Sequence, residues 1–523
     1  MGLILSKLKG GPRHLIDSLR FTAQKHRVKR AANKKRPLEK ALGWVRSNIV
    51  PGRGIVTHSK SNQVTQEVTG YFIPTLYHAG EKELACALAK WVASVQRPDG
   101  SFVGPDNHPY TFDTAQVIRG FLAVVDDMPE LNNNLKRACE YVVSQITNEG
   151  EVLSPSYNAW ELPDGSTFSI YANLYVLPPL LQAGRKLSEP MYVEAARKGM
   201  DYFKRKADLV EFKPEMSTLS HIFGYMMEAL TEMGELDMAR RGLTQVATIQ
   251  KLNGAIPAYP GVEWVCSTGI AQLAVAWYKL AEIEPANRAM DYLEKIQNSS
   301  GGFYGSYGKG AKYFPKEEIS WAVKYFIDAY LLKIKTDFNQ EVHIYSEEIA
   351  ENDGRVQSIL SCFGGLTKKK VIDVGCGKGR YLRILQNRFP GSRLYGIDLS
   401  EEMLKSCPEG VETSVGTMLN IRYPDAFFDF VYSVEALEHA VAIEPAIKEM
   451  VRVLKPGGKI VIIDKNAAKL GVFRIKPWER WFNPKEITAL LRKHGVATSF
   501  KPVSYDEYRA DGVFISWEGV KND

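Results

Sequence analysis

The 523-residue chain lacks the features that would place it in a membrane or in an oxidising compartment. No apolar run reaches the roughly 18 residues that a membrane span needs, and no segment has the apolar core and cleavage site of a signal peptide. Cysteine is scarce and lacks disulfide-like spacing, which favours a reducing compartment. The cysteines are Cys86, Cys139, Cys266, Cys362, Cys376 and Cys407. We therefore expect a cytoplasmic protein.

Metal-binding patterns are missing as well. The sequence has neither a paired Cys-x-x-Cys nor a cluster of His, Asp and Glu with metal-ligand spacing. We therefore expect a site without a metal ion. The length and the apolar fraction of 45% are ample for two or three domains with sizeable cores.

Positive charge is concentrated in residues 1–40, which hold twelve Lys and Arg against two acids, a net charge of +10 in a chain of net charge +7. Apolar residues such as Leu3 and Phe21 alternate with the basic ones, as on a helix lying on an anionic membrane. Met1–Ser6 also fits the loose pattern for N-myristoylation. We expect residues 1–36 to bind the cytoplasmic face of an anionic membrane; a solvated basic tail is the alternative. No nucleic acid partner is expected, because no recognition motif accompanies the charge.

The most informative stretch is residues 371–398. It contains an apolar strand, a loop with three glycines, a helix, and a second strand that ends on Asp398. In order, these are Val371–Val374, Gly375 with Gly377 and Gly379, Tyr381–Arg388, and Arg393–Ile397. Glycines let the backbone approach a ligand, the helix N-terminus offers free N–H groups, and an acid about 20 residues on accepts ribose hydroxyls. The stretch predicts a nucleotide-type ligand.

The flanking residues distinguish between nucleotides. The third glycine of a dinucleotide-binding G-x-G-x-x-G loop would fall at Arg380, and an acid, Asp373, lies two residues before the first glycine. Further motifs follow in order: Gly416–Thr417, Phe428–Ser433, Glu435–His439, Arg452–Gly458 and Lys459–Asp464. The series resembles the class I S-adenosylmethionine-dependent methyltransferases, and most of all the small-molecule branch with quinone-biosynthesis C-methyltransferases and sugar and natural-product O-methyltransferases. The resemblance covers about residues 340–523.

This resemblance implies S-adenosyl-L-methionine as the cofactor. The methionine ammonium needs a carboxylate or carbonyl partner, which Asp373 and the backbone around Gly375 would supply, and Asp398 would accept both ribose hydroxyls. Adenine would lie near Thr417 and Met418, although many relatives carry an acid where this chain has Thr417. The predicted cofactor residues are Asp373, Gly375, Cys376, Gly377, Gly379, Asp398, Leu399, Thr417 and Met418. The alternatives are that Asp373 caps the glycine turn and that Thr417 is an ordinary turn residue.

Methyl transfer to a hydroxyl requires a base that removes its proton as the new bond forms. His439 is the first candidate because it follows a strand at the carboxyl edge of the sheet and has an ordinary pKa near neutrality. Glu435 is the second candidate. Alternatively, His439 caps the following helix or orients Glu438.

Residues 41–335 carry a degenerate repeat of about 45 to 60 residues. Each of six units has a helix, a Gly/Pro-rich loop and a second, more apolar helix. The second helices are expected to start near Thr69, Phe112, Ile170, Thr218, Ser267 and Ile319. The pattern predicts an all-α (α/α)6 toroid in residues 41–335, followed by an α/β Rossmann-like methyltransferase domain in residues 336–523. With motifs such as SVQRPDGSF and FDTAQVIRGF, the repeat resembles, at fold level only, the toroids of terpene cyclases, prenyltransferases, and sugar epimerases, hydrolases and lyases.

In such toroids the pocket lies where the inner helices begin, and acids and aromatics gather near that rim. They are Glu67, Tyr71, Asp113, Gln116, Tyr171, His221, Tyr225, Glu263, Trp264, Glu318 and Trp321. The Asp-x-Asp-Asp cluster of protonating terpene cyclases is absent, and a prenyltransferase zinc set is not evident. We predict a glycan-binding or glycan-modifying domain; the alternative is that these residues cap helices and pack the ring.

Together these observations predict methylation of a small-molecule or glycan acceptor, most simply O-methylation of a saccharide or a lipid-linked saccharide. Methylation of a quinone or another lipid acceptor is the rival, as is a toroid that serves only as a binding scaffold.

Overall fold

The computed structural model describes residues 36–162, 165–206, 208–364, 368–470, 479–504 and 512–523. The chain divides into two compact units, one formed by Pro37–Asp337 and the other containing Phe338–Asp523. The predicted membrane-binding segment, apart from Arg36, lies outside the described residues. Among the helices of the described part, none is both long enough and apolar enough to cross a bilayer.

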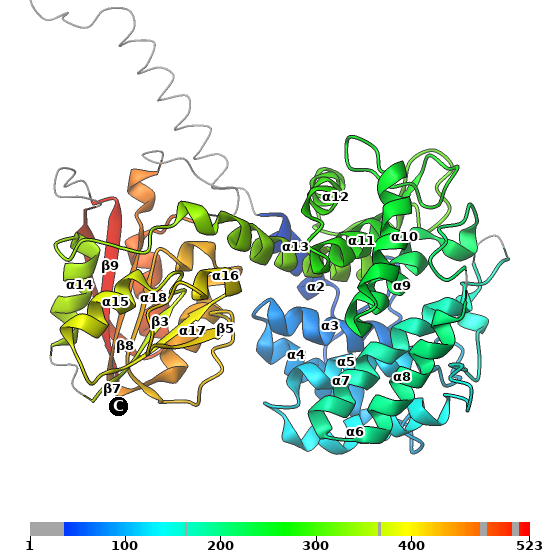
Figure 1. Ribbon diagram of the computed structural model, residues 1–523, viewed down its shortest axis with the longest axis horizontal. Helices are drawn as coiled ribbons and strands as arrows, with labels where there is room; N and C mark the ends of the chain where they lie inside the picture. Colours follow the sequence, from blue (N-terminus) through cyan, green and yellow to red (C-terminus); the bar gives the residue numbers. More distant parts are fainter. Residues whose placement is uncertain (1–35, 163–164, 207, 365–367, 471–478, 505–511) are drawn as a thin grey trace, which may run out of the picture. The chain divides into compact units, whose positions relative to one another are not determined.

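The N-terminal unit is built from helices that alternate between two kinds (Figure 1). The first kind buries one face: α2 (Pro37–Ser47), α4 (Lys82–Ser94), α6 (Asn132–Ser144), α8 (Pro190–Lys204), α10 (Leu236–Ile249) and α12 (Ile283–Ile296). The second kind is more extensively buried: α3 (Gln66–His78), α5 (Thr111–Val124), α7 (Leu177–Leu187), α9 (Ser220–Met233), α11 (Ser267–Lys279) and α13 (Ser320–Gln340). A short antiparallel pair, β1 (Val265–Cys266) and β2 (Ser306–Tyr307), precedes α11 and α13.

The two kinds of helix follow from their sequences. In α4 the buried residues Ala85, Leu88, Ala89 and Val92 recur at the spacing of one helical face, which is typical of a helix on the outside of a core. In α11 every residue from Ser267 to Tyr278 is buried, so that helix lies inside the unit. The predicted alternation of amphipathic and apolar helices is therefore present.

Contacts between α3 and α13 connect the first and the last of the apolar helices. The hydroxyl of Thr75 donates a hydrogen bond to Oδ1 of Asp328 across 2.7 Å, and the rings of Tyr71 and Tyr325 lie 6.4 Å apart. These contacts are in keeping with a ring of six hairpins, and the (α/α)6 toroid stays a prediction.

One apolar helix differs from its expected form. The segment that begins at Ile170 is a 3-10 helix (Ile170–Val176), and the α-helix α7 starts only at Leu177. Pro178 and Pro179 follow directly, and proline is favoured in the first turn of an α-helix because its missing N–H has no partner there.

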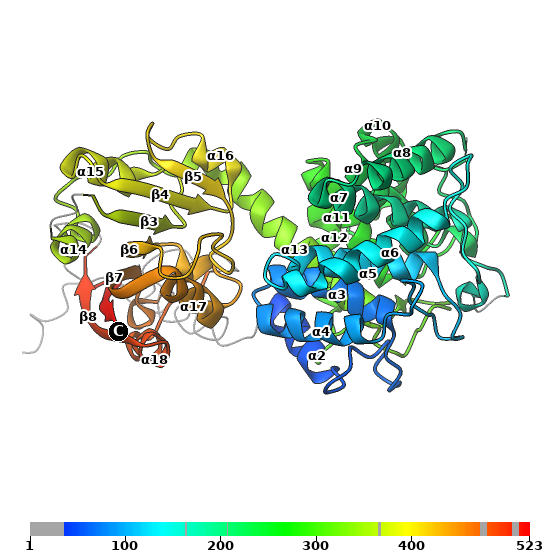
Figure 2. The ribbon, with the colours of Figure 1, turned by 90° about the horizontal axis from the view of Figure 1, so that it is seen from below.

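The C-terminal unit contains a seven-stranded sheet in the order β5-β4-β3-β6-β7-β9-β8 (Figure 2). The strands are β3 (Lys370–Val374), β4 (Arg393–Asp398), β5 (Glu412–Val415), β6 (Phe428–Val434), β7 (Leu454–Lys465), β8 (Val496–Val503) and β9 (Phe514–Lys521). Strands β3 to β7 pair in parallel, whereas β9 is antiparallel to β7 and β8. The predicted Rossmann-like arrangement is confirmed, with an antiparallel addition that the motifs did not indicate.

Helices cover both faces of this sheet. The helices are α14 (Gly354–Phe363), α15 (Arg380–Arg388), α16 (Glu401–Leu404), α17 (Ile443–Val453) and α18 (Pro484–Lys493). Apolar side chains of α14 and α15 join one core, and those of α17 and α18 join another. From β3 the chain proceeds to β4 and β5 on one side, then returns to β6 on the other side of β3. Ligands of open α/β sheets bind at the carboxyl ends of the strands beside such a reversal.

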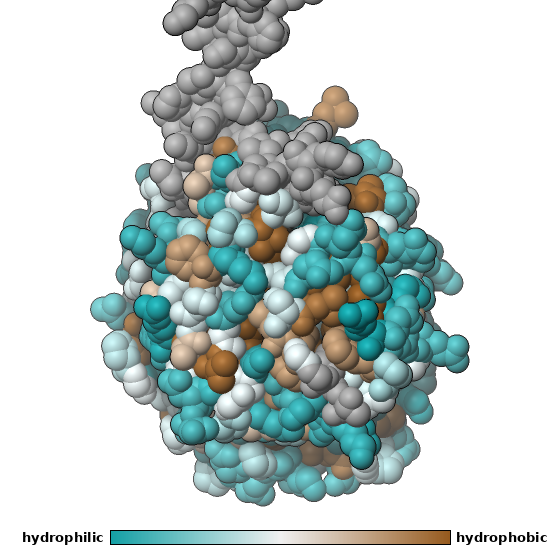
Figure 3. All heavy atoms as spheres, turned by 90° about the vertical axis from the view of Figure 1, so that its left-hand side faces the viewer, coloured by the Kyte–Doolittle hydropathy of each residue, from teal (hydrophilic) through white to brown (hydrophobic). Residues whose placement is uncertain are grey.

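One edge of the sheet is strand β8 and the other is β5. Phe500 of β8 has 44% of its surface exposed, and the neighbouring Lys501 forms an ion pair of 2.7 Å with Glu518. Charged residues on an edge strand oppose pairing with other chains. On the face of the molecule seen in Figure 3, apolar side chains lie among polar ones.

Candidate active site

The glycine loop joins β3 to α15 and is tied to the end of β4. The backbone N–H groups of Gly375 and Cys376 donate to the carbonyl of Ile397 across 2.8 and 3.1 Å. Gly375 has φ of +83°, and a Cβ there would lie 2.4 Å from the Cβ of Ala436. A larger residue therefore fits neither the backbone conformation nor the space. Glycine at this position also lets a ligand approach the backbone of the loop closely.

Asp398 ends β4 as predicted and also holds the loop. Its Oδ2 accepts the N–H of Gly377 across 2.8 Å, and its Oδ1 accepts the N–H of Ser400 across 2.9 Å. Burial raises the pKa of this carboxyl. A carboxylate offers about four lone-pair positions, so each oxygen retains capacity to accept a ribose hydroxyl.

Asp373 lies at the end of β3 and is 1% exposed. Its Oδ2 has no hydrogen-bond partner among the described residues, although the nearby hydroxyl of Tyr432 lowers its pKa. Burial dominates and raises the pKa of Asp373 to about 8. A buried acceptor without a partner is costly. The methionine ammonium of S-adenosylmethionine would both pair with Asp373 and favour its ionised form, so the residues present fit this cofactor.

Two arginines that carried no prediction lie beside these acids. Arg355, in the first turn of α14, donates to Oε2 of Glu435 across 2.5 Å, and Arg380, which follows the glycine loop, donates to the same oxygen across 2.7 Å. Glu435 has φ of +52°, which is uncommon outside glycine. Ion pairs with two guanidinium groups thus hold Glu435, the second base candidate, in this strained conformation. Only Arg380 had a sequence signal, its place after the third glycine.

His439 ends a short 3-10 helix (Leu437–His439) after β6. Its Nε2 lies 3.2 Å from Oε1 of Glu438, which also accepts from Nζ of Lys465 across 2.9 Å. Burial pushes the pKa of Glu438 upward, but hydrogen bonding by His439 and the charges of His439 and Lys465 outweigh it, so the pKa is lowered. In the described residues Nδ1 of His439 has no partner. Glu438 thus contacts the ring through Nε2, and Nδ1 is buried.

The remaining predicted cofactor residues surround the same loop. The methyl group of Met418 would lie 3.7 Å from a Cβ at Gly375, and the Thr417 hydroxyl accepts the N–H of Leu419 across 3.3 Å. Leu399 is half-buried beside Asp398. The thiol of Cys376 is buried, as expected for a packing residue of the loop.

The N-terminal unit brings only some of its predicted rim residues together. Glu67 and Tyr71 lie one turn apart on α3, and α3 packs against α5, the helix that carries Asp113. Glu318 is instead engaged by Nε1 of Trp44 across 2.6 Å and by Nδ2 of Asn298 across 2.7 Å.

Two further predicted residues point elsewhere. The hydroxyl of Tyr171 donates to Oδ1 of Asp208 across 2.7 Å, and Glu263 is exposed. The structure thus divides the predicted rim into a buried cluster and several residues with other partners.

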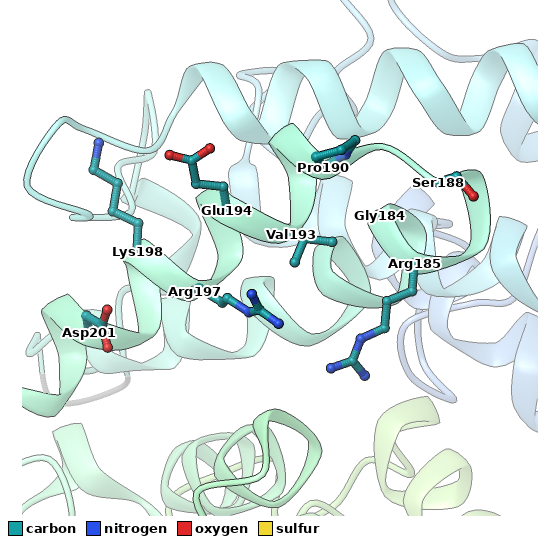
Figure 4. A pocket seen from close by; sticks show the side chains of 9 residues that line it. All are labelled: Gly184, Arg185, Ser188, Pro190, Val193, Glu194, Arg197, Lys198 and Asp201. Atoms are coloured by element: carbon teal, nitrogen blue, oxygen red, sulfur yellow. The ribbon is translucent and has the colours of Figure 1, made fainter.

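A surface groove of about 930 Å³ lies between the end of α7 and helix α8. In Figure 4 the guanidinium groups of Arg185 and Arg197 extend to the same side of these helices. None of the predicted site residues lines this groove. Its volume alone does not identify a functional site.

The comparisons with known proteins concern the C-terminal unit, where residues 372–462 match the methyltransferase domain family. The chain is 36% identical to the chloroplastic tocopherol O-methyltransferase of Arabidopsis thaliana, over 24% of this chain and 44% of that protein. It is 34% identical to 2-methyl-6-phytyl-1,4-hydroquinone methyltransferase of Synechocystis sp., over 21% of this chain and 36% of that protein. It is 29% identical to demethylmenaquinone methyltransferase of Geobacillus sp., over 26% of this chain and 67% of that protein. The chain spans less than half the length of the first two.

The fold, the motifs and the family match agree. The C-terminal unit is a methyltransferase domain of the class that uses S-adenosylmethionine, and it is an enzyme domain. The predictions of cofactor and enzyme class are confirmed. The roles of single residues stay predictions.

Proposed function

We propose that the whole protein is an S-adenosylmethionine-dependent methyltransferase that methylates a hydroxyl group of a small molecule, with His439 as the general base. When bound, the cofactor supplies an electrophilic methyl group on a sulfonium. Asp373 and Asp398 would hold its ammonium and ribose ends, with the backbone of the glycine loop between them. Orienting the two reactants removes much of the entropic barrier of such a transfer.

The observation that carries this proposal is the pairing of His439 with Glu438. Hydrogen bonding of Nε2 to a carboxylate fixes the neutral tautomer in which Nδ1 carries the lone pair. A histidine in this state accepts a proton from a hydroxyl as the C–O bond forms. Its place supports the role, because His439 follows β6, and β6 pairs with β3, which carries Asp373.

For the acceptor we propose a saccharide or a lipid-linked saccharide. The support comes from the N-terminal unit, where acids and aromatic rings occur together, because sugars stack on aromatic rings and bond to carboxylates. In this proposal Glu67, Tyr71, Asp113 and His221 bind the sugar.

A prenylated quinol is the second candidate. The names of three relatives favour it, since those proteins act on tocopherol, a phytylhydroquinone and demethylmenaquinone. A histidine base can also remove the proton of a phenolic hydroxyl.

We further propose that residues 1–36 hold the protein at an anionic membrane surface. The support is their charge and their interspersed apolar residues. Each basic residue near such a surface contributes about 1 kcal/mol, so the attraction suffices for reversible binding. A protein that lacks residues 1–36 should no longer sediment with anionic vesicles, and full-length protein that ignores such vesicles at low salt would contradict the proposal.

The acceptor is tested by incubating the full-length protein with methyl-labelled S-adenosylmethionine and a lipid extract, followed by acid hydrolysis of the product. Label on a sugar supports the first candidate, and label on a quinone supports the second. The variant His439→Gln serves as the control for enzymatic transfer. Equal labelling by this variant and the wild type would remove the histidine from the mechanism.

A further inference from the structure

The interior of the N-terminal unit holds two carboxyl groups without a cationic partner. Glu67 lies in the first turn of α3, and Asp113 lies in the first turn of α5. Within the described part of the chain neither forms an ion pair, although Asp113 is 4% exposed. Burial raises the pKa of Glu67 to about 7, and burial together with the charge of Glu67 raises that of Asp113 well above its usual range. Near neutral pH the pair therefore retains a proton and offers both a donor and acceptors.

Aromatic rings surround this carboxyl pair. Glu67 lies one helical turn before Tyr71 on α3. The rings of Tyr71 and Tyr225 lie 6.4 and 6.0 Å from that of Tyr325, and the Tyr313 ring lies 6.1 Å from that of His221. The Tyr225 ring lies 4.6 Å from the ring of His221. These tyrosines are buried, whereas Glu67 keeps accessible surface. Glu67 thus lies beside buried aromatic rings.

Two fully buried glutamines add polar atoms that lack partners. The Oε1 of Gln116 and the Nε2 of Gln272 have no hydrogen bond within the residues that the structure describes. An unsatisfied buried polar atom costs about 1–3 kcal/mol. Such atoms in a native interior are free to bond a ligand.

Both glutamines belong to the neighbourhood of the carboxyl pair. Gln116 lies one helical turn after Phe112, whose ring is 5.1 Å from that of Tyr225, so the two share a face of α5. Gln272 accepts through Oε1 from Nδ1 of His221 across 2.7 Å. Burial lowers the pKa of His221 to about 4, so at neutral pH this ring is uncharged and Nδ1 is the donor.

We propose that the N-terminal unit contains its own binding site for an uncharged polyhydroxylated molecule, a saccharide, formed by Glu67, Asp113, Gln116 and Gln272. A hydroxyl both donates and accepts, so it matches a free amide oxygen, a free amide N–H and the two carboxyl groups. The tyrosine rings offer faces on which a sugar ring stacks. This proposal rests on the saccharide acceptor proposed above and names the residues of the N-terminal unit that would bind it.

A cation is the alternative ligand for a site of acids and aromatic rings. The charged groups around the site favour an uncharged ligand. The other charged groups inside the unit are already paired. Lys324 lies 2.9 Å from Asp328, and Arg119 lies 2.7 Å from Glu232. The ammonium of Lys324 also lies 3.6 Å from the centre of the Tyr325 ring and 5.5 Å from that of Tyr71. A positive charge is thus already present beside these tyrosine rings, and it would repel a cationic ligand.

The test uses full-length protein and the variant Gln116→Met, which keeps the side-chain volume and removes the unsatisfied oxygen. A glycan array of neutral and uronic oligosaccharides identifies a bound probe, and equilibrium dialysis then measures its affinity. The variant is expected to bind at least tenfold more weakly while its Tm changes little, because removal of the unsatisfied Oε1 offsets the loss of the 3.3 Å hydrogen bond from Nε2 to the Phe112 carbonyl. A purely structural glutamine would instead lower the Tm when replaced.

Two further variants separate the outcomes. Gln63→Met, at an exposed glutamine, should bind as the wild type does, and Glu67→Gln should weaken binding while keeping the fold and S-adenosylmethionine binding. His439→Gln should retain the saccharide, which distinguishes this site from the methyl-transfer proposal. A protein that retains no oligosaccharide, or one whose Gln116→Met variant binds unchanged, overturns the proposal. Retention of spermidine in place of sugars would assign the site to a cation and overturn it as well.

Discussion

The carboxylate of Asp398 accepts the backbone N–H of Gly377 across 2.8 Å, so one side chain joins the end of β4 to the loop that follows β3. The same carboxylate is the predicted partner of the ribose. We therefore expect a change at Asp398 to affect both the loop conformation and cofactor binding.

The variant Asp398→Ala should lose most of its affinity for S-adenosylmethionine. It removes two acceptors of backbone N–H groups and the ribose contacts together, and each hydrogen bond to a charged group contributes about 1.5–3 kcal/mol. Calorimetry should show at least a hundredfold weaker binding. Asp425→Ala is the matched control, since the Asp425 side chain is 80% exposed. Equal losses in the two variants would mean that the effect is nonspecific.

The buried carboxyl of Asp373 should make the protein without bound cofactor less stable as the pH rises. Its pKa is raised from 3.8 to about 8, so between these values the folded state holds a proton that the unfolded chain has released. Stability from this group is fully present below pH 4 and is lost as the pH approaches 8. The difference in unfolding free energy between wild type and Asp373→Asn, measured from pH 5 to 8, should show this slope. Parallel curves would contradict the assignment.

The same protonation predicts the pH dependence of cofactor binding. An ammonium pairs with the ionised form of Asp373, so binding must release the carboxyl proton below pH 8. Affinity should rise with pH from 6 towards 8, and calorimetry in buffers of different ionisation enthalpy should detect proton release. In Asp373→Asn the affinity should be lower and the release of this proton absent. Proton uptake by the wild type on binding would refute the pairing.

The variant His439→Ala should lower kcat by about 10²- to 10⁴-fold, the usual contribution of a general base. Its affinity for S-adenosylmethionine should change little. Glu438→Gln should lower kcat as well, because an amide no longer fixes the tautomer of the imidazole. Single-turnover rates of labelled methyl transfer provide the measurement. Unchanged rates in His439→Ala would leave the reaction without the base that we propose.

The variant Gly375→Ala should abolish cofactor binding and lower stability. A left-handed residue with a Cβ costs about 1–2 kcal/mol, and here the new methyl group would also meet Ala436 at 2.4 Å. Gly391→Ala is the control, because Gly391 has φ of +93° but open space around its Cβ position. Denaturant titration should therefore show a larger loss for Gly375→Ala, and cofactor binding by Gly391→Ala should persist.

Local patterns predicted the parts of the fold that depend on neighbouring residues. The strand before Gly375, the helix after Gly379 and the strand that ends on Asp398 lie where the sequence placed them. Turn glycines and short apolar runs act over a few residues, so a single sequence reveals them.

Contacts between distant residues could not be predicted in this way. Arg355 reaches Glu435 from 80 positions away, and the pairing changes how a base candidate is to be understood. Gln272 orients His221 from 51 positions away, and nothing in a glutamine within an apolar helix signals that partner. The unsatisfied atoms of the buried glutamines depend on the whole packed interior.

Strand β9 (Phe514–Lys521) lies between β7 and β8, with Trp517 fully buried. One of the two edges of β7 thus pairs with residues that follow some fifty positions later in the sequence. In the N-terminal unit, by contrast, the two helices of each hairpin follow one another closely in the chain. During synthesis the helical unit should reach its native contacts first, and a chain released after Val503 should expose β7 and resist proteolysis only in its N-terminal unit. We therefore expect the sheet to be completed by the insertion of β9 between β7 and β8, after the helical unit has formed.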